Sequence, residues 1–258
     1  MTEVPDTPIT VDVDGAVAVI RMNRPEVLNA LDEEGYRLPW EALVEFDTDP
    51  RLRAAILTGV GDRSFSTGSD MGGANWTRDV DQPVVVTEDR ESAALTKPVI
   101  AAIDGYCLGG GLEWALRCDI RIATPRSSFG LPEPRWGTLA GYGLHMLSRM
   151  IPPGEALYLQ LTGDRITAER AFRCCLVQEL VEPAELMRRA QEIAGMITAC
   201  SPLAVQAIKQ TVDFGLRAGV EDSYRFVRPV AAAIGRSEDA HEGPSAFRDK
   251  RVPEWKGR

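Results

Sequence analysis

The sequence AAIDGYCLGGGLE, residues 101–113, joins a short apolar segment to three consecutive glycines and then to a carboxylate. Glycine lets the backbone adopt conformations closed to other residues and lets a ligand approach peptide N–H groups closely. A helix that starts at these glycines directs unpaired N–H groups and the positive end of its dipole outward. Such an end suits an anion, or a carbonyl oxygen that becomes negative during a reaction. We therefore expect an oxyanion-binding site at Gly109–Gly111, with Glu113 beside it as an acid–base group.

Strands and helices are expected to alternate on both sides of this stretch. Thr10–Arg21 alternates in polarity around Asp14-Gly15, which predicts a hairpin. Asp32 predicts the cap of a helix to about Phe46, in which Pro39 predicts a kink or a late start. The other expected elements are strands at Ala54–Thr58, Val99–Ile103 and Ile120–Ala123, a helix at Leu112–Cys118 and a loop at Gly59–Asp70. This alternation is typical of an α/β fold.

The last quarter of the chain has a different pattern. From about Pro183 the sequence is nearly all helical, and Ser201-Pro202 predicts a helix start that leads to about Arg217. Further helical stretches follow Val220 and Ser237. We therefore expect two regions, residues 1–200 and residues 201–258.

Composition excludes several classes of function. The 258 residues carry a net charge of −9, whereas a nucleic-acid partner needs a basic surface. No apolar run approaches the roughly 20 residues of a membrane span, and the first residues lack the pattern of a signal peptide. The five cysteines form no C-x-x-C pair, and the two histidines lie far apart. We expect a cytoplasmic protein that binds no metal, no nucleic acid and no membrane.

Several motifs, taken in order, resemble those of the crotonase superfamily (the enoyl-CoA hydratase/isomerase family). They are RPEVLNAL at 24–31, FSTGSDM at 65–71, KPVIAA at 97–102, GYCLGGGLE at 105–113, FGLPE at 129–133 and the segment 237–251. The resemblance covers about residues 10–258. Ile151-Pro152-Pro153 and the ending Trp255–Arg258 lean toward members that are similar to carnitinyl-CoA dehydratase.

The resemblance implies a fold, an assembly and a site. It implies a spiral of ββα units in residues 1–200, and a C-terminal helical region, 201–258, that builds a homotrimer or a dimer of trimers. It implies an acyl-CoA thioester substrate and no separate cofactor, since coenzyme A is part of the substrate. Glu113 and Glu133 would be catalytic, and the N–H groups of Ser69 and Gly110 would form the oxyanion hole. The substrate-binding residues implied are Arg24, Val27, Leu28, Thr67, Ser69, Asp70, Met71, Gly109, Gly110, Trp136 and Lys250.

The chemistry that these residues can perform is hydration of a 2-enoyl thioester. Negative charge builds on the thioester oxygen while water adds at the β-carbon and a proton reaches the α-carbon. Two carboxyl groups in different environments can divide the proton work. Glu113, at a helix N-terminus, suits the charged form that holds the water. Glu133, between two prolines in an apolar segment, suits a form kept protonated by desolvation. We predict an enoyl-CoA hydratase that adds water reversibly and with syn geometry.

Other functions remain open at this level. A delta-isomerase that shifts the double bond needs only one carboxylate, and a carnitinyl-CoA dehydratase needs a cage for a quaternary ammonium. Trp136 and Tyr142 could offer aromatic faces for such a cage. A non-catalytic binding protein of the same fold would have lost a glutamate. Ser69 and His145 raise the possibility of a serine hydrolase, although the sequence contains no G-x-S-x-G motif.

Overall fold

The structure is a computed structural model that describes residues 7–72 and 95–258. Its larger sheet has six strands in the order β1-β2-β3-β5-β7-β10. All neighbouring strands are parallel except the β1–β2 hairpin. The strands are β1 (Ile9–Asp14), β2 (Val17–Met22), β3 (Ala54–Gly59), β5 (Val99–Ile103), β7 (Ile120–Ala123) and β10 (Glu179–Leu180). The central strands are continuous apolar runs because both faces of a parallel sheet are covered.

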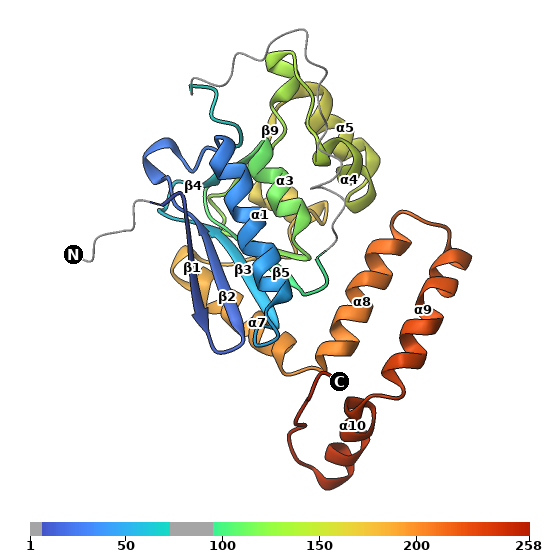
Figure 1. Ribbon diagram of the computed structural model, residues 1–258. Helices are drawn as coiled ribbons and strands as arrows, with labels where there is room; N and C mark the ends of the chain where they lie inside the picture. Colours follow the sequence, from blue (N-terminus) through green and yellow to red (C-terminus); the bar gives the residue numbers. More distant parts are fainter. Residues whose placement is uncertain (1–6, 73–94) are drawn as a thin grey trace, which may run out of the picture.

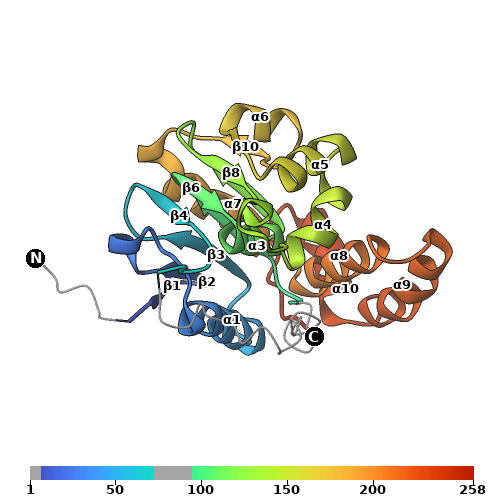
Figure 2. The same cartoon turned by 90° about the horizontal axis from the view of Figure 1, so that it is seen from above.

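The second sheet has four short strands in the order β4-β6-β8-β9. They are β4 (Ser64–Ser66), β6 (Tyr106–Leu108), β8 (Ser128–Gly130) and β9 (Arg165–Thr167). Within the described residues, the chain passes from the larger sheet to the smaller one three times, from β3 to β4, from β5 to β6 and from β7 to β8. Successive passages stack as turns of a spiral built from ββα units (Figure 2).

Helices cover both faces of the six-stranded sheet (Figure 1). On one face, α7 (Leu186–Thr198) packs on alternate residues of the strands, including Ile56, Ile100 and Ile122. On the other face, α1 (Glu33–Thr48) and α3 (Gly110–Arg117) pack on the intervening residues. The remaining helical elements that the structure describes before residue 200 are η1 (Pro25–Val27), η2 (Glu133–Trp136), α4 (Tyr142–Met150), α5 (Pro153–Thr162), α6 (Ala168–Arg173) and η3 (Pro183–Glu185).

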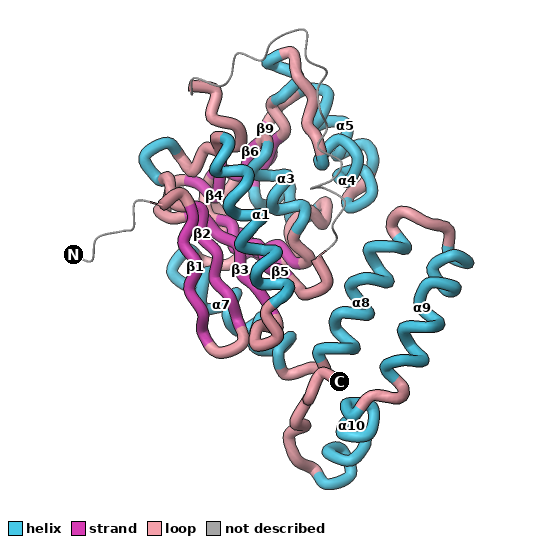
Figure 3. Tube along the Cα trace, in the orientation of Figure 1, coloured by secondary structure: helices cyan, strands magenta, loops and turns pink. Residues whose placement is uncertain are grey.

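The C-terminal helices form an arm beside this core. Helices α8 (Pro202–Gly215) and α9 (Val220–Ile234) make a hairpin that extends away from the sheets, and α10 (Glu238–Asp249) lies at its base (Figures 1 and 3). Phe214 and Phe226 stack inside the hairpin with ring centroids 4.6 Å apart. Lys209 joins α8 to the core, since its Nζ lies 2.7 Å from Asp119 Oδ2. Within residues 7–72 and 95–258, no helix combines the length and apolar character needed to cross a bilayer.

The structure confirms the predicted hairpin, strands and helices and corrects three details. The expected loop at Gly59–Asp70 contains strand β4, which is too short to show a pattern. Helix α3 begins at Gly110, two residues before the predicted start at Leu112. Helix α1 has no late start and runs on past Pro39, which is buried against the core and removes only one backbone hydrogen bond. Asp32 caps α1 as expected and accepts the N–H of Gly35 at 2.8 Å.

Candidate active site

The triple glycine makes a sharp turn between β6 and α3. Gly109 has φ 53° and ψ −129°, a conformation that side chains disfavour, and it forms the N-cap of α3. Gly110 is the first helical residue, so its N–H has no acceptor within the helix. A Cβ built on Gly109 would lie 3.2 Å from Oε1 of Glu133. The carboxyl group of Glu133 therefore lies against the turn that the glycines make.

The loop that carries Ser69 lies beside the same helix start. Leu31 donates its N–H to the carbonyl of Gly68 at 2.8 Å and accepts the N–H of Asp70 at 2.9 Å. In this parallel bridge the N–H of Ser69 points away from Leu31. A Cβ built on Gly68 would lie 2.7 Å from the nitrogen of Gly110. The fold thus brings the two predicted oxyanion donors, on Ser69 and Gly110, to one place.

Arg24 and Asp70 hold this loop. Arg24 Nη2 lies 3.2 Å from Asp70 Oδ2, and Nη1 lies 3.0 Å from Asp32 Oδ2. The other oxygen of Asp70 accepts the N–H of Gly72 at 3.2 Å. The guanidinium of Arg24 is thus already paired with two carboxylates. In the structure, Arg24 and Asp70 therefore act as residues that position the loop of Ser69.

Asn29 connects this loop to the smaller sheet. It is buried, with φ 53°, and its amide donates to the carbonyls of Val60 and Ser64 at 3.0 and 2.9 Å. Its own carbonyl accepts the hydroxyl of Ser66 at 2.8 Å. Two residues of the RPEVLNAL motif therefore hold neighbouring segments: Asn29 binds β4, and Arg24 binds the loop that follows β4.

Glu113 lies in the first turn of α3 and is half-buried. Its Oε1 accepts the N–H of Gly143 at 2.7 Å, from the start of α4. Two helix N-termini thus surround this carboxyl group. Both the hydrogen bond and the helix dipoles favour its charged form.

Glu133 has a different environment. Desolvation raises the pKa of Glu133 from 4.5 to about 7, the charge of Glu113 adds to this rise, and a backbone hydrogen bond opposes it. Its Oε2 is buried and has no hydrogen-bond partner among the residues that the structure describes. Near neutral pH this carboxyl group is therefore divided between its protonated and charged forms. The two glutamates form a coupled pair, in which the charge of Glu113 adds to the rise in the pKa of Glu133.

Tyr36 and Gly143 are the site residues that the sequence patterns missed. The hydroxyl of Tyr36, on α1, lies 2.8 Å from Oγ of Ser69, and a Cβ built on Gly110 would collide with it. No local pattern signals this contact, because the residues lie 33 positions apart. For Gly143, the pair Gly141-x-Gly143 before a helix weakly indicated a backbone N–H open to a ligand or side chain. Its partner Glu113 is 30 positions away.

Most of the other implied substrate residues lie on the same short segments as the residues described above. Val27 and Leu28 lie at the end of η1, and Trp136 belongs to η2 with Glu133. Thr67 donates its hydroxyl to the carbonyl of Leu28 at 3.4 Å, so η1 and the loop after β4 are joined. Val27, Met71 and Trp136 are 38%, 43% and 61% exposed. Lys250 is not brought there, because it caps α10, which Figure 1 places far from α3.

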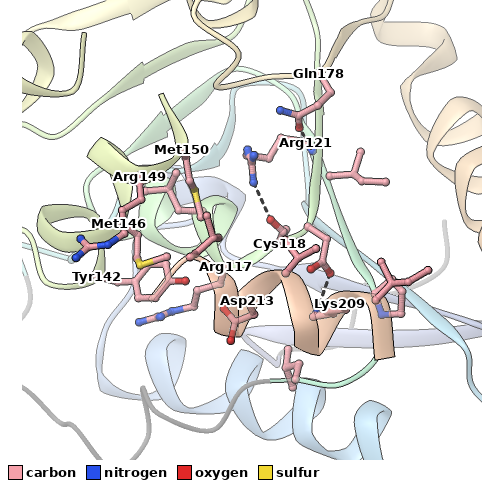
Figure 4. Close-up of a pocket in the computed structure, with 18 of the residues that line it drawn as sticks. Arg117, Cys118, Arg121, Tyr142, Met146, Arg149, Met150, Gln178, Lys209 and Asp213 are labelled. Atoms are coloured by element: carbon pink, nitrogen blue, oxygen red, sulfur yellow. Dashed lines mark hydrogen bonds and ion pairs between the residues drawn. The ribbon is translucent and has the colours of Figure 1, made fainter. Parts of the chain in front are cut away.

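A cavity of about 730 Å³ lies at the C-terminal end of α3, between α3, α4 and α8 (Figure 4). Its wall includes Arg117, Tyr142, Met146 and Lys209. The guanidinium of Arg117 stands 4.0 Å from the ring centroid of Tyr142. One face of Tyr142 is therefore occupied, which weakens the expected aromatic cage with Trp136.

The hydrolase alternative finds no support in the site. A nucleophilic serine needs a base within hydrogen-bond reach. Among the described residues, the partner of the Ser69 hydroxyl is Tyr36, and His145 is an exposed residue of α4. Ser69 thus contributes a backbone N–H and a hydroxyl paired with a tyrosine.

The chain is similar to known proteins over nearly its whole length. Residues 12–258 match the Enoyl-CoA hydratase/isomerase family. An (E)-benzylidenesuccinyl-CoA hydratase from Thauera aromatica is 39% identical over 97% of this chain and 99% of its own. A carnitinyl-CoA dehydratase from Salmonella arizonae is 39% identical over 95% of this chain and 96% of its own.

Solved structures agree with the sequence matches. An enoyl-CoA hydratase from Bacillus anthracis superposes with a TM-score of 0.92 at 31% identity, covering 98% of this chain and all of the other. One from Mycobacterium tuberculosis gives 0.90 at 35% identity, covering 98% of this chain and all of the other. The chain is therefore an enzyme of the enoyl-CoA hydratase/isomerase family, which is the crotonase superfamily.

Proposed function

We propose that this enzyme adds water reversibly, with syn geometry, to the double bond of a 2-enoyl-CoA thioester. The coupled pair of Glu113 and Glu133 beside the glycine turn is the observation that carries this proposal. One carboxyl group is held by a backbone N–H, and the pKa of the other is raised to about 7. Such a pair supplies a base and an acid in one site near neutral pH.

The proposed reaction assigns one task to each group. The thioester oxygen accepts the N–H groups of Ser69 and Gly110, which stabilise the charge that forms there. Glu113 holds a water molecule and takes its proton as the oxygen bonds to the β-carbon. Glu133 gives its proton to the α-carbon, so that one water is added in total. The proton that Glu113 received then returns to Glu133 and restores both groups for the next turnover. The reverse sequence removes water from the 3-hydroxyacyl thioester.

The proposal needs no metal and no redox cofactor, because the thioester itself accepts the electrons as an enolate. The cytoplasmic location expected from the sequence stays a prediction.

We further propose that the chain works as a homotrimer or a dimer of trimers, assembled through residues 201–258. Helix α9 contains no buried residue, and Ile208 and Val212 of α8 are 64% and 58% exposed. Exposed apolar faces of this kind mark sites of protein contact. Light scattering after gel filtration should give the mass of three or six chains. A double variant Ile208→Glu, Val212→Glu should give a smaller species, and an unchanged mass would contradict this assembly route.

The acyl group is the open part of the proposal. The named relatives act on benzylidenesuccinyl-CoA and carnitinyl-CoA, whereas we propose a short 2-enoyl group for this enzyme. An isomerase is the second candidate, but retention of both glutamates favours hydration.

A panel of thioesters tests these alternatives directly. It contains crotonyl-CoA, a longer 2-enoyl-CoA, a 3-enoyl-CoA, crotonobetainyl-CoA and an aryl-substituted 2-enoyl-CoA. Loss of the enoyl absorbance and the product mass are followed for each. Uptake of one water by crotonyl-CoA supports the proposal. Double-bond migration without water uptake would make the enzyme an isomerase, and a strong preference for crotonobetainyl-CoA would make it a carnitinyl-CoA dehydratase.

A further inference from the structure

Two hydroxyl groups meet where the two oxyanion donors converge. The hydroxyl of Tyr36 lies 2.8 Å from Oγ of Ser69, and it occupies the position that a side chain on Gly110 would take. Tyr36 is 37% exposed and Ser69 is also exposed, so both border the open side of the site. The hydroxyl pair thus contacts both residues whose N–H groups are assigned to the thioester oxygen.

A pair of hydroxyls carries two protons and shares only one of them. Whichever hydroxyl donates to the other, one O–H remains. Within residues 7–72 and 95–258, the hydrogen bond between Tyr36 and Ser69 is the only one that either side chain makes. The remaining O–H is therefore available to a ligand that enters beside Gly110.

We propose that the Tyr36–Ser69 hydroxyl pair is a third donor to the thioester oxygen, beside the N–H groups of Ser69 and Gly110. The inference rests on the proposed function, since it names a further group at the same oxyanion hole. The pair acts as one unit: Ser69 fixes the position of the tyrosine hydroxyl, and the tyrosine places the donor over Gly110.

The electrostatic setting keeps the pair in its donor form. Desolvation is the main cause that raises the pKa of Tyr36 to about 12; its hydrogen bond to Ser69 opposes the rise, and Glu113 and Glu133 add to it. The phenol stays neutral across the working pH range and keeps its proton. The charges of Glu113 and Glu133 also disfavour ionisation of this hydroxyl.

Tyr36→Phe tests the inference, because it removes the hydroxyl and keeps the ring. Tyr106→Phe is the matched control: Tyr106 is also 37% exposed, and it starts β6 at the end away from the glycines. We expect kcat/KM of Tyr36→Phe on the best enoyl-CoA of the panel to fall about 10- to 100-fold, as for loss of one hydrogen bond to a charged oxygen. The fall should be mainly in kcat, because the bond strengthens in the transition state.

A spectroscopic readout separates this role from packing. Bound 4-(dimethylamino)cinnamoyl-CoA absorbs at longer wavelength when donors polarise its carbonyl. The wild type and Tyr106→Phe should show the full shift, and Tyr36→Phe and Ser69→Ala a smaller one. The double variant Tyr36→Phe, Ser69→Ala should be no worse than the worse single variant, because the two hydroxyls act as one unit.

Each outcome has a defined meaning. A higher KM for Tyr36→Phe with unchanged kcat and unchanged shift would make Tyr36 a wall residue and overturn the inference. So would an absent shift in the wild type. The wild type could instead hydrate no thioester and still show a shift that is lost in Tyr36→Phe. That result would support the hydroxyl pair as a donor and refute the proposed reaction. Hydration that is equal in Tyr36→Phe and Tyr106→Phe would refute the donor and leave the reaction standing.

Discussion

The two ends of helix α3 have opposite characters. At the N-terminal end, the N–H of Gly110 has no helical acceptor, and two carboxyl groups lie beside it. At the C-terminal end, Arg121 donates to the carbonyl of Cys118 at 2.7 Å, and Arg117 stacks on Tyr142. The large cavity adjoins the second end, whereas the coupled glutamates belong to the first.

The proposed function therefore places the reaction at the end of α3 that presents N–H donors, and not at the end beside the large cavity. An N-terminus presents donors to a developing negative charge, whereas a C-terminus presents carbonyls that attract cations. At the C-terminal end of α3, Arg121 donates a hydrogen bond to the carbonyl of Cys118. At the N-terminal end, the N–H of Gly110 remains open to a ligand. Five experiments test the contrast, and those with the greatest expected loss of activity come first.

Removal of either carboxylate should have the largest effect. Glu113→Gln and Glu133→Gln should each lower kcat by about 10²- to 10⁴-fold, because each removes one proton-transfer group. The double variant should be little worse than the worse single variant, since the two act together. Glu182→Gln, at an exposed position before η3, is the control. If either single variant kept more than half of the wild-type rate with the best substrate, the assignment of the pair would fail.

The N–H of Gly110 is tested next, in a background that makes room for a side chain. A Cβ on Gly110 collides with Tyr36, so both variants carry Tyr36→Ala. Gly110→Ala then keeps the N–H, and Gly110→Pro removes it at a helix position that accepts proline. We expect the proline variant to be slower by about 10²- to 10³-fold. Circular dichroism and the melting temperature check the fold, and equal rates in two folded variants would exclude this N–H as a donor.

The third experiment is pH dependence. Glu133 must be protonated to give its proton, and its pKa is raised to about 7. Hydration should therefore fall above about pH 7, by about tenfold per pH unit once the carboxyl is charged. A profile of kcat/KM from pH 5 to 9 measures this limb, which should lie near pH 7 and well above the ordinary range of a glutamate.

The same shift affects stability with a defined sign. Because the folded pKa lies above the ordinary 4.5, the folded state binds the proton more tightly than the unfolded state. This contribution is fully present below about pH 4.5 and is lost as the pH rises toward 7. The free energy of unfolding of the wild type, relative to Glu133→Gln, should decrease across this window. A constant difference would show that Glu133 titrates normally.

The smallest effect is expected at the cavity end of α3. Tyr142→Phe makes the same chemical change as Tyr36→Phe but leaves the ring that stacks on Arg117. Turnover should change by less than about twofold, since the proposed reaction assigns no catalytic group to this end. Rates with short and long enoyl groups give the measurement. A tenfold loss of turnover with the long substrate alone would mean that the cavity receives the acyl chain. It would contradict the assignment of the reaction to the N-terminal end of α3 alone.

The sequence predicted the local elements of the site well. Three glycines after an apolar run predicted the turn and the start of α3, and the position of Glu113 followed from them. The hairpin around Asp14-Gly15 and the cap at Asp32 were predicted from turn and capping chemistry. These features depend on residues within one turn of each other, so a short window of sequence contains the information. Strand β4 was missed because three residues make no readable period.

The way in which these parts combine depends on tertiary contacts. Tyr36 meets Ser69, Gly143 meets Glu113 and Arg24 meets Asp70 across 33, 30 and 46 positions of sequence. Each contact depends on the path of the chain through both sheets, and no local preference sets it. The raised pKa of Glu133 is of the same kind, since desolvation and a neighbouring charge arise only after folding. The local chemistry of the chain was enough to nominate the groups that bind and transfer protons, because it depends on residue type and short spacing. Their pairing and their protonation came from packing, because distance and burial are properties of the folded chain.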